Sequence, residues 1–312
     1  GGGTPSLLSA ESMADLLYGV KERIAVSPTA EITMEANPGT VEAERFAGFQ
    51  RAGVNRISIG VQSFGDEKLI RLGRIHDADE AKNAARLAKE LGLRSFNLDL
   101  MHGLPDQSLS QALSDLQQAI ELSPPHLSWY QLTIEPNTQF GSRPPKLPDD
   151  DMLWDIFSEG DKLLTAAGYQ QYETSAYCKP GFQCEHNLNY WRFGDYLGIG
   201  CGAHGKISFE DGRIMRTVKT KHPKGFMEGR YLDQQHFVDN DDRPFEFFMN
   251  RFRLLEAFPR QDFSDYTGLS EEVIRHQIDE ALALDYISES DTHWQITPHG
   301  KLFLNSLLEL FL

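Results

Sequence analysis

The sequence predicts an α/β protein in which a full or partial (β/α) barrel precedes a small C-terminal domain of helical, winged-helix-like type. Its 312 residues, at about 150 residues per domain, suggest about two domains. Up to about residue 175, short apolar runs alternate with longer amphipathic stretches, which is the pattern of parallel βα units. Four or more such units in one acidic chain favour a barrel over a doubly wound sheet. We expect residues 1–235 to form the barrel and residues 236–312 to form the C-terminal domain.

The first expected strand covers residues 31–36 and stops at Asn37-Pro38-Gly39. A helix should follow as far as Gly53, with Thr40 as its N-cap and acidic residues in its first turn, where the helix dipole favours them. The capping box is incomplete, because Ala43 stands where Glu or Gln would be needed. By the same patterns, further strands are expected at 56–61, 95–100 and 127–134, and further helices at 79–91, 109–122 and 152–167.

After about Tyr177 the composition shifts to Gly, Cys, His, Asn and aromatic residues, which indicates a loop-rich region. Two β-type runs, at 206–209 and 213–217, flank Glu210-Asp211-Gly212 and predict a hairpin. The remaining expected elements are a helical region at 244–257, a helix at 271–284, a short strand at 285–287 and a wing at 294–296.

Winged helices often bind DNA, but the charge of this chain disfavours that partner. The helix that follows Ser270 holds four acidic residues against one Arg and one His. Over the whole chain, Lys and Arg number 30 and Asp and Glu number 46, so the formal net charge is −16. A duplex would be repelled by this field. We therefore expect no nucleic-acid partner.

Composition also excludes several classes of protein. Hydrophobic residues make up 40% and charged residues 24%, which is typical of a globular chain and not of a disordered one. No apolar run approaches the roughly 20 residues that a bilayer span requires, so we expect no transmembrane segment, and transient contact with a membrane is left open. The chain has three cysteines, Cys178, Cys184 and Cys201. An odd and small number does not suit a disulfide framework, and it favours a protein of the reducing cytoplasm.

Polar residues follow the predicted strands at the edge where a barrel builds its site. Glu35 and Gln62 stand at two strand ends, and Asp99 with His102 at a third. The chain begins with Gly1-Gly2-Gly3-Thr4, whose backbone N–H groups could meet an anion, although a flexible end is the alternative. The alternative for Glu35 and for Asp99 is that the carboxylate caps the next helix.

Two arginines follow the strand that ends at Gln62. Arg74 could make a two-pronged contact with a carboxylate, while Arg71 faces solvent. The alternative for each is an ordinary surface arginine. The sequence therefore predicts a mixed acidic, amide and cationic site at one edge of the barrel.

Six ordered motifs together resemble one family, the radical S-adenosylmethionine (radical SAM) proteins of the HemW type. These haem chaperones carry the label oxygen-independent coproporphyrinogen III oxidase-like. The resemblance runs from Gly1 to Leu312 and implies a partial (β/α) barrel of the radical SAM type with a C-terminal HemN-type domain. The motifs are Gly1-Gly2-Gly3-Thr4-Pro5-Ser6, Met34-Glu35-Ala36-Asn37-Pro38, Gly60-Val61-Gln62-Ser63-Phe64, Leu72-Gly73-Arg74-Ile75-His76, Asp99-Leu100-Met101-His102-Gly103-Leu104-Pro105 and His186-Asn187-Leu188-Asn189-Tyr190-Trp191.

The resemblance implies an S-adenosylmethionine site. A zwitterion needs one anion, one cation and donor amides, and the matching residues supply them. By position, Gly2, Gly3 and Thr4 would meet the methionyl part, Glu35 its ammonium and Arg74 its carboxylate, while Gln62 and Asp99 would hold ribose hydroxyls.

In this family a Cys-x-x-x-Cys-x-x-Cys loop upstream of the glycines holds a 4Fe-4S cluster. That loop is absent from this sequence, and Cys178 and Cys184 have the wrong spacing to replace it. The resemblance therefore implies a chain that starts after the family's first barrel strand and cluster loop. We expect no metal ligand in this chain, and cluster and radical chemistry only in a longer parent.

Two histidines are candidates for haem. His186 opens a motif whose Tyr190 and Trp191 could flank a porphyrin face, and imidazole is a common axial ligand. His204, which lies near where oxidase relatives close the cosubstrate pocket, and Cys184 are both weaker candidates than His186. The alternative is that these side chains only cap the backbone of a loop.

The favoured function is a haem chaperone that hands haem to recipient haemoproteins, with S-adenosylmethionine and a 4Fe-4S cluster in the full-length protein. The alternative is an oxygen-independent coproporphyrinogen III dehydrogenase, which would oxidatively decarboxylate two propionates. Such an enzyme must hold several carboxylates with basic side chains. A winged-helix nucleic-acid binder is the third hypothesis.

Overall fold

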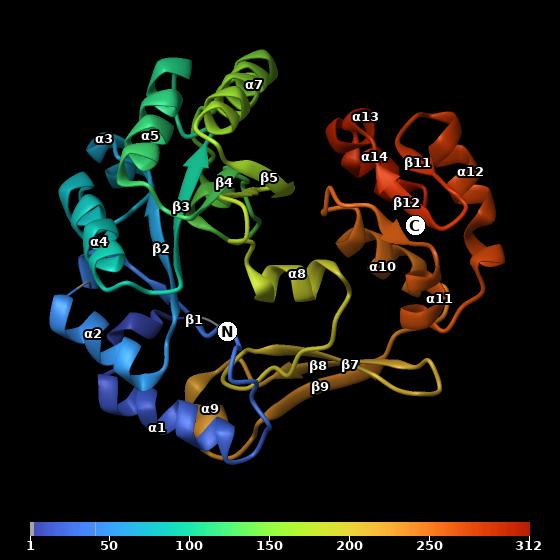
Figure 1. Cartoon of the computed structure of the whole chain (residues 1–312), viewed down its shortest axis with the longest axis horizontal. Coiled ribbons are helices and arrows are strands. Elements are labelled where there is room, and N and C mark those ends of the chain that lie inside the picture. Colours follow the sequence, from blue (N-terminus) through green and yellow to red (C-terminus); the bar gives the residue numbers. More distant parts are fainter. Residues whose placement is uncertain (1–2, 41) are drawn as a thin grey trace. The chain divides into compact units, whose positions relative to one another are not determined.

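The computed structural model describes residues 3–40 and 42–312, which form two compact units. The N-terminal unit holds Thr4–Gln171 and Ser175–Gln183, and the C-terminal unit holds Gly3, Tyr172–Thr174 and Cys184–Leu312. Figure 1 shows both units, with their helices and strands labelled where there is room. The predicted boundary between residues 235 and 236 refers to family domains and stays a prediction.

The N-terminal unit is built on a six-stranded sheet with the order β1-β2-β3-β4-β6-β5. Strands β1 to β4 pair in parallel, and β6 pairs antiparallel with β4. The predicted α/β class is therefore confirmed, and the described strands form an open sheet instead of a closed barrel. The bounds are β1 (Thr33–Ala36), β2 (Arg56–Gln62), β3 (Ser95–His102), β4 (His126–Gln131), β5 (Gln170–Glu173) and β6 (Ala176–Cys178).

The main helices of the N-terminal unit begin and end close to their predicted positions. Two capping boxes explain this agreement: Asp77 with Glu80 starts α4, and Ser108 with Gln111 starts α5. Across the described ranges, no helix has both the length and the apolar character that crossing a membrane requires. The bounds are η1 (Pro5–Leu7), α1 (Ala10–Lys21), η2 (Pro38–Thr40), α2 (Ala43–Ala52), α3 (Asp66–Arg71), α4 (Ala78–Glu90), α5 (Leu109–Leu122), α6 (Gln139–Ser142) and α7 (Asp150–Ala166).

The prediction that Thr40 caps the helix ending near Gly53 is wrong. Helix α2 begins at Ala43, with Glu42 in the N-cap position, and Thr40 ends the short helix η2. The Thr40 hydroxyl donates to the backbone oxygen of Asn37 at 2.8 Å and lies 2.7 Å from the hydroxyl of Ser6. The Thr40 hydroxyl is therefore engaged in the turn at residues 38–40 and does not cap α2.

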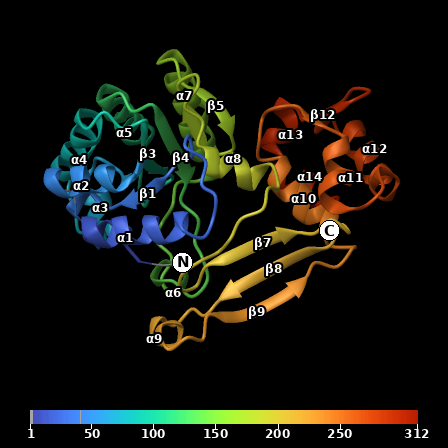
Figure 2. The same cartoon turned by 60° about the horizontal axis from the view of Figure 1, so that its bottom comes forward.

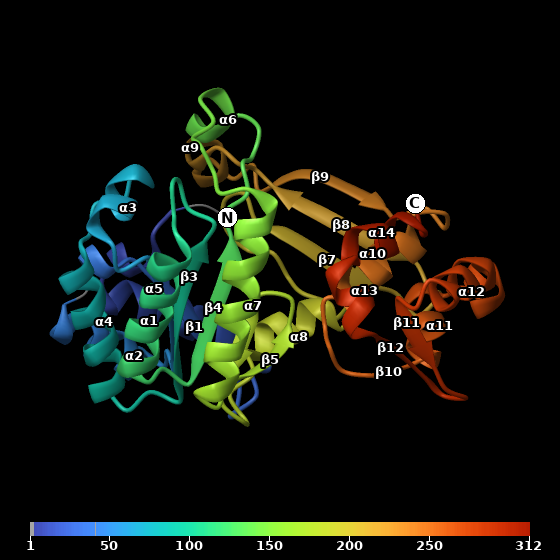
Figure 3. The same cartoon turned by 90° about the horizontal axis from the view of Figure 1, so that it is seen from above.

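The two faces of this sheet differ in polarity, since successive side chains along a strand point to opposite faces. Buried apolar side chains such as Ile57, Leu98 and Trp129 share one core with residues of α2, α4, α5 and α7. Figure 3 shows α2, α4 and α5 along one side of β1 and β3. The strand register brings polar side chains together on the other face: Glu35, Ser58, Asn97, Asp99, His126, Ser128 and Tyr130. We call this surface the polar face.

The C-terminal unit contains a three-stranded antiparallel sheet of β7 (His204–Ser208), β8 (Ile214–Lys219) and β9 (Leu232–Phe237). The three strands lie side by side in Figure 2. Strands β7 and β8 confirm the predicted hairpin. Lys206, Arg216 and His236 are in register across the sheet, so their side chains share one face.

The remainder of the C-terminal unit packs around an aromatic core that includes Phe247, Phe248 and Trp294. The helix expected at 271–284 is divided into a 3-10 turn and α12, and the two predicted strands are present as β11 and β12, which pair with each other. The bounds are α8 (Glu185–Trp191), α9 (Pro223–Met227), α10 (Arg243–Arg251), β10 (Phe258–Pro259), α11 (Gln261–Thr267), η3 (Glu271–Ile274), α12 (Arg275–Ala283), β11 (Ile287–Glu289), β12 (His293–Ile296), α13 (Pro298–Leu302) and α14 (Leu304–Glu309).

Candidate functional site

Tyr130 on β4 connects the predicted site residues of the polar face. Its hydroxyl donates to Oε1 of Gln62 at 2.9 Å. Burial raises the pKa of Tyr130 to about 12, and the negative charges of Asp99 and Glu35 raise this pKa as well. The positive charge of Arg74 and the hydrogen bond to Gln62 lower it. Four residues that were predicted from the sequence therefore influence the pKa of Tyr130, which was not itself predicted as a site residue.

Gln62 adopts a backbone conformation that is unusual for its residue type. It ends β2 with a φ of 69°, in the left-handed region, and the pairing of β2 with β3 shifts register between Ile59 and Gln62. A Cβ atom on Gly60 would lie 3.1 Å from Nε2 of Gln62, closer than most such contacts. The bulge and the glycine together let the Gln62 amide lie against the backbone of its own strand.

Asp99 is held by a network of polar side chains on three strands. Its Oδ1 accepts from Nδ2 of Asn97 at 2.8 Å and its Oδ2 accepts from the hydroxyl of Ser58 at 3.0 Å. His126 Nδ1 lies 2.7 Å from Oδ1 of Asn97, which orients the amide so that its NH2 group faces Asp99. Burial raises the pKa of Asp99, and these hydrogen bonds oppose that rise. Asp99 is thus fixed in place with both oxygens engaged.

The other predicted residues of this site lie at its margins. Glu35 is exposed on β1, in register with Ser58, and Arg74 is exposed after α3. Thr4 occupies the N-cap position of η1 with no side-chain cap bond. Gly2 lies outside the described residues. Gly3 has a φ of 101°, which suits glycine, and belongs to the C-terminal unit.

His102, which follows Asp99 in the motif, points away from the polar face. It is buried with its ring centroid 4.4 Å from that of Trp129, on the side of the apolar core. Burial lowers its pKa to about 4, so the imidazole is neutral at pH 7. Its position three residues after Asp99 explains this, because odd spacing along a strand changes the face. His102 therefore contributes packing and not site chemistry.

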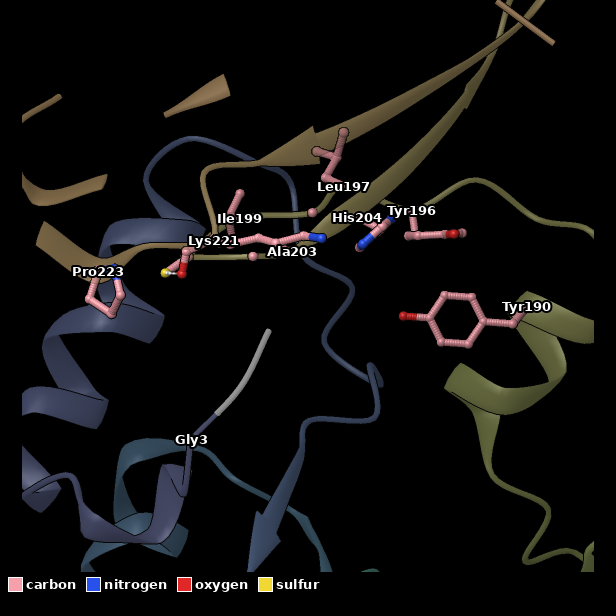
Figure 4. Close-up of a pocket in the computed structure, with 12 residues that line it drawn as sticks. Gly3, Tyr190, Tyr196, Leu197, Ile199, Ala203, His204, Lys221 and Pro223 are labelled. Atoms are coloured by element: carbon pink, nitrogen blue, oxygen red, sulfur yellow. Dashed lines mark hydrogen bonds between the residues drawn. The ribbon is translucent and has the colours of Figure 1, made fainter. Parts of the chain in front are cut away.

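A cavity in the C-terminal unit, called the larger cavity below, has a volume of about 850 Å³, within the range of ligand pockets. Leu197 and Ile199 line it with exposed apolar side chains, 61% and 63% accessible. Tyr190 from α8, His204 and Lys221 supply polar groups, and the Tyr190 hydroxyl points into the space that they border (Figure 4). Apolar walls, one imidazole and one ammonium suit a flat apolar ligand that carries an anionic group.

A smaller cavity of about 470 Å³ adjoins the larger one. Tyr190, Tyr196 and His204 line both, so they form a shared wall. The rings of Tyr190 and Tyr196 meet edge to face with centroids 4.6 Å apart, which braces this wall. His204 is exposed at the start of β7 and is available to a ligand from either side.

His186 occupies a different position from His204. Its Nδ1 lies 3.1 Å from Sγ of the buried Cys184, and its ring meets that of Tyr190 edge to face at 6.4 Å. Of these two predicted histidines, only His204 is among the described residues that line the cavities. The assignment of either histidine to haem stays a prediction.

None of the three cysteines forms a disulfide within the described residues. Burial raises the pKa of the Cys178 thiol to about 11, so it is protonated at neutral pH. Cys201 donates to the backbone oxygen of Lys221 at 2.8 Å. An iron–sulfur cluster needs thiolates, which the protonated Cys178 does not offer.

Models of two families match this chain. The radical SAM superfamily model matches residues 1–116, and the HemN C-terminal domain model matches residues 238–303. The protein named "Heme chaperone HemW" of Escherichia coli (strain K12) is 75% identical over 312 residues, which are 100% of this chain and 82% of that protein. Its namesake in Haemophilus influenzae is 69% identical with the same coverage.

Two more distant similarities extend this result. The mouse protein "Radical S-adenosyl methionine domain-containing protein 1, mitochondrial" is 42% identical over 213 residues, 66% of this chain and 48% of the mouse protein. The solved structure of coproporphyrinogen III oxidase (HemN) from Escherichia coli, a radical SAM enzyme, superposes with a TM-score of 0.82. It covers 100% of this chain and 76% of the oxidase, at 23% identity, and therefore shows a shared fold.

Proposed function

Because this chain belongs to the HemW family of radical SAM proteins, we propose that it binds haem and delivers it to recipient haemoproteins. The observation that carries the proposal is the pair of adjoining cavities in the C-terminal unit, divided by His204 and two tyrosines. Close relatives that span this whole chain are named haem chaperones, which supports the same function. Three cysteines without a disulfide agree with action in the reducing cytoplasm.

His204 is the proposed axial ligand of the haem iron. Imidazole nitrogen binds haem iron readily, and this imidazole lines both cavities at an exposed position. Leu197 and Ile199 would lie against the porphyrin face, which removes their apolar surface from water. His186, next to Tyr190, is the second candidate ligand.

The polar face of the N-terminal unit is the proposed S-adenosylmethionine site. The charges of Glu35 and Arg74 both influence the pKa of Tyr130, and in this site Glu35 would face the ammonium and Arg74 the carboxylate. Gln62 and Asp99 would hold ribose hydroxyls. Radical chemistry on S-adenosylmethionine would need a reduced 4Fe-4S cluster to supply an electron. The residues of this chain fit the cosubstrate, whereas its three cysteines do not have the spacing of the family's cluster loop.

The alternative function, coproporphyrinogen III dehydrogenase, is supported by the fold shared with HemN and by little else in this chain. A dehydrogenase must hold four propionates with basic groups. Among the described lining residues, the larger cavity has Lys221 and the smaller one has Lys206 and Arg216, which are fewer cations than four propionates. The apolar character of Leu197 and Ile199 suits haem better than the more highly charged substrate.

The proposed function is tested by comparing two tetrapyrroles and by following transfer. The chain is titrated with haem and, separately, with coproporphyrin III, a stable oxidised form of the dehydrogenase substrate. A chaperone should bind haem more tightly and pass it to an apo-haemoprotein, which is followed by the change in absorbance. Tighter binding of coproporphyrin III, or haem that is bound and never released to the acceptor, would refute the proposal.

A further inference from the structure

The smaller cavity contains two cations on one face of the β7-β8-β9 sheet. Lys206 and Arg216 are register partners on β7 and β8, and His236 continues the row on β9. All three line the cavity, together with aromatic residues such as Trp191 and Phe193. An aromatic wall beside cations is suited to a flat ligand with acidic substituents.

Lys206 has no donor left for a ligand. Its ammonium carries three N–H groups. These are engaged with the backbone oxygen of Phe193 at 3.0 Å, with Asp195 at 2.8 Å and with the hydroxyl of Ser208 at 2.9 Å. The side chain is 2% exposed, and burial lowers its pKa. Lys206 therefore stabilises the loop that leads to Tyr196 and is not available to a ligand.

Arg216 differs from Lys206 in having unused donors. Its Nε and Nη2 donate to Oε2 of Glu246 at 3.1 and 2.6 Å, and its Nη1 donates to the hydroxyl of Tyr196 at 3.1 Å. A guanidinium has five N–H groups, so among the described residues two remain without an acceptor. The side chain is 20% exposed and lines the cavity, which makes those two donors accessible.

The hydrogen bond to Tyr196 places Arg216 next to the wall that the two cavities share. Tyr196 lines both cavities and packs edge to face against Tyr190. A ligand that fills the larger cavity against His204 can therefore extend an acidic substituent past the two tyrosines toward Arg216. The geometry holds the guanidinium in one orientation through Glu246, so little side-chain entropy is lost on binding.

We propose that Arg216 binds a carboxylate of the ligand in the smaller cavity and so selects porphyrins that carry free propionates. This inference deepens the proposed haem function and rests on it. The two unused N–H groups of Arg216 would donate to the carboxylate, a charge-assisted contact of the kind that discriminates strongly between an acid and its ester.

The test compares haem with its dimethyl ester, in which both propionates are blocked, in one detergent-containing buffer. Wild-type chain should bind haem at least about tenfold more tightly than the ester, since a charged hydrogen-bond pair is lost. Arg216→Gln should lower the affinity for haem by a similar factor and leave the affinity for the ester unchanged. Arg230→Gln, which removes an arginine that is paired with Glu228 and lines neither cavity, is the matched control and should change neither affinity.

The outcomes separate this inference from the function on which it rests. Equal affinities of the wild-type chain for haem and ester overturn the role of Arg216 without any variant that has to fold. Unchanged haem affinity in a folded Arg216→Gln overturns it as well. In both cases haem binding, and with it the proposed function, would stand. Failure of the wild-type chain to bind haem at all would instead refute the proposed function.

Discussion

The hydroxyl of Tyr130 donates a 2.9 Å hydrogen bond to Oε1 of Gln62, across 68 residues of sequence. This bond joins β4 to the bulged end of β2, and it engages the carbonyl of an amide whose backbone is in the left-handed region. The Nε2 group of Gln62 is then turned to the side of Gly60. The orientation of the proposed ribose contact therefore depends on a phenol on another strand.

Tyr130→Phe should weaken the binding of S-adenosylhomocysteine, a cosubstrate analogue that lacks the sulfonium. The ring is kept and one hydrogen bond is lost, so the expected cost is about 1 kcal/mol, or roughly fivefold in affinity. Calorimetric titration measures it. Tyr18→Phe, an exposed tyrosine on α1, is the control and should bind as the wild type does. An unchanged affinity in Tyr130→Phe would contradict the role of this bond.

Gly60→Ala should also lower the affinity for S-adenosylhomocysteine. Its new methyl group would lie 3.1 Å from Nε2 of Gln62 and would push the amide away. Gly19→Ala on α1, where a Cβ meets only the end of Arg23 at 3.7 Å, is the matched control. That change should raise the free energy of unfolding by up to about 1 kcal/mol and leave binding unaffected. If both variants bind the analogue equally well, Gly60 has no part in placing Gln62.

Gly160→Ala should destabilise the N-terminal unit. A Cβ at this position in α7 would lie 2.0 Å from the indole of Trp129, a rigid ring in the core, so helix or strand must move. Overpacking of this kind costs about 1–3 kcal/mol. Urea unfolding of the variant and the wild type measures the change. A free energy of unfolding within error of the wild type would show that α7 can shift without cost.

The stability of the chain should fall as the pH is lowered from about 6.5 to about 4. Burial lowers the pKa of His102 to about 4, below the value near 6.5 of an unfolded histidine. In this window the unfolded state binds a proton that the folded state does not, so acid favours unfolding. The full difference corresponds to about 3 kcal/mol.

Urea unfolding at several pH values tests this origin of the acid sensitivity. His102→Phe keeps an aromatic ring against Trp129 and removes the titrating group, so its stability should depend less on pH across this window. Burial also lowers the pKa of His76, so some dependence should remain in the variant. Identical slopes for wild type and His102→Phe would show that His102 does not contribute.

The sequence predicted local structure best where caps and periodicity agree. The helix expected at 109–122 has those bounds in the structure, since Ser108 and Gln111 form a capping box. Thr40 was misassigned because the turn after Pro38 uses its hydroxyl, a contact that includes Ser6 more than thirty residues away. Patterns in neighbouring residues cannot predict a hydrogen-bond partner that only tertiary folding brings close.

The same limit applies to the candidate sites. Glu35, Gln62 and Asp99 could be predicted because strand ends mark the edge of a sheet where sites form. Tyr130 was missed because a tyrosine within a strand is also typical of ordinary strand residues. Tyr130 lies two residues after Ser128 and so shares its face of β4, and Ser128 is the register partner of Asp99. This relation could have revealed Tyr130, but it requires knowing how β3 pairs with β4.

The absorption spectrum of the haem-loaded chain tests the central claim most directly. His204→Ala should shift the Soret band and weaken haem binding, because the proposed axial ligand is removed, while His186→Ala should leave the band in place. The opposite pattern would move the ligand to His186. A band unchanged in both variants would contradict the claim that either histidine holds the iron in the C-terminal unit.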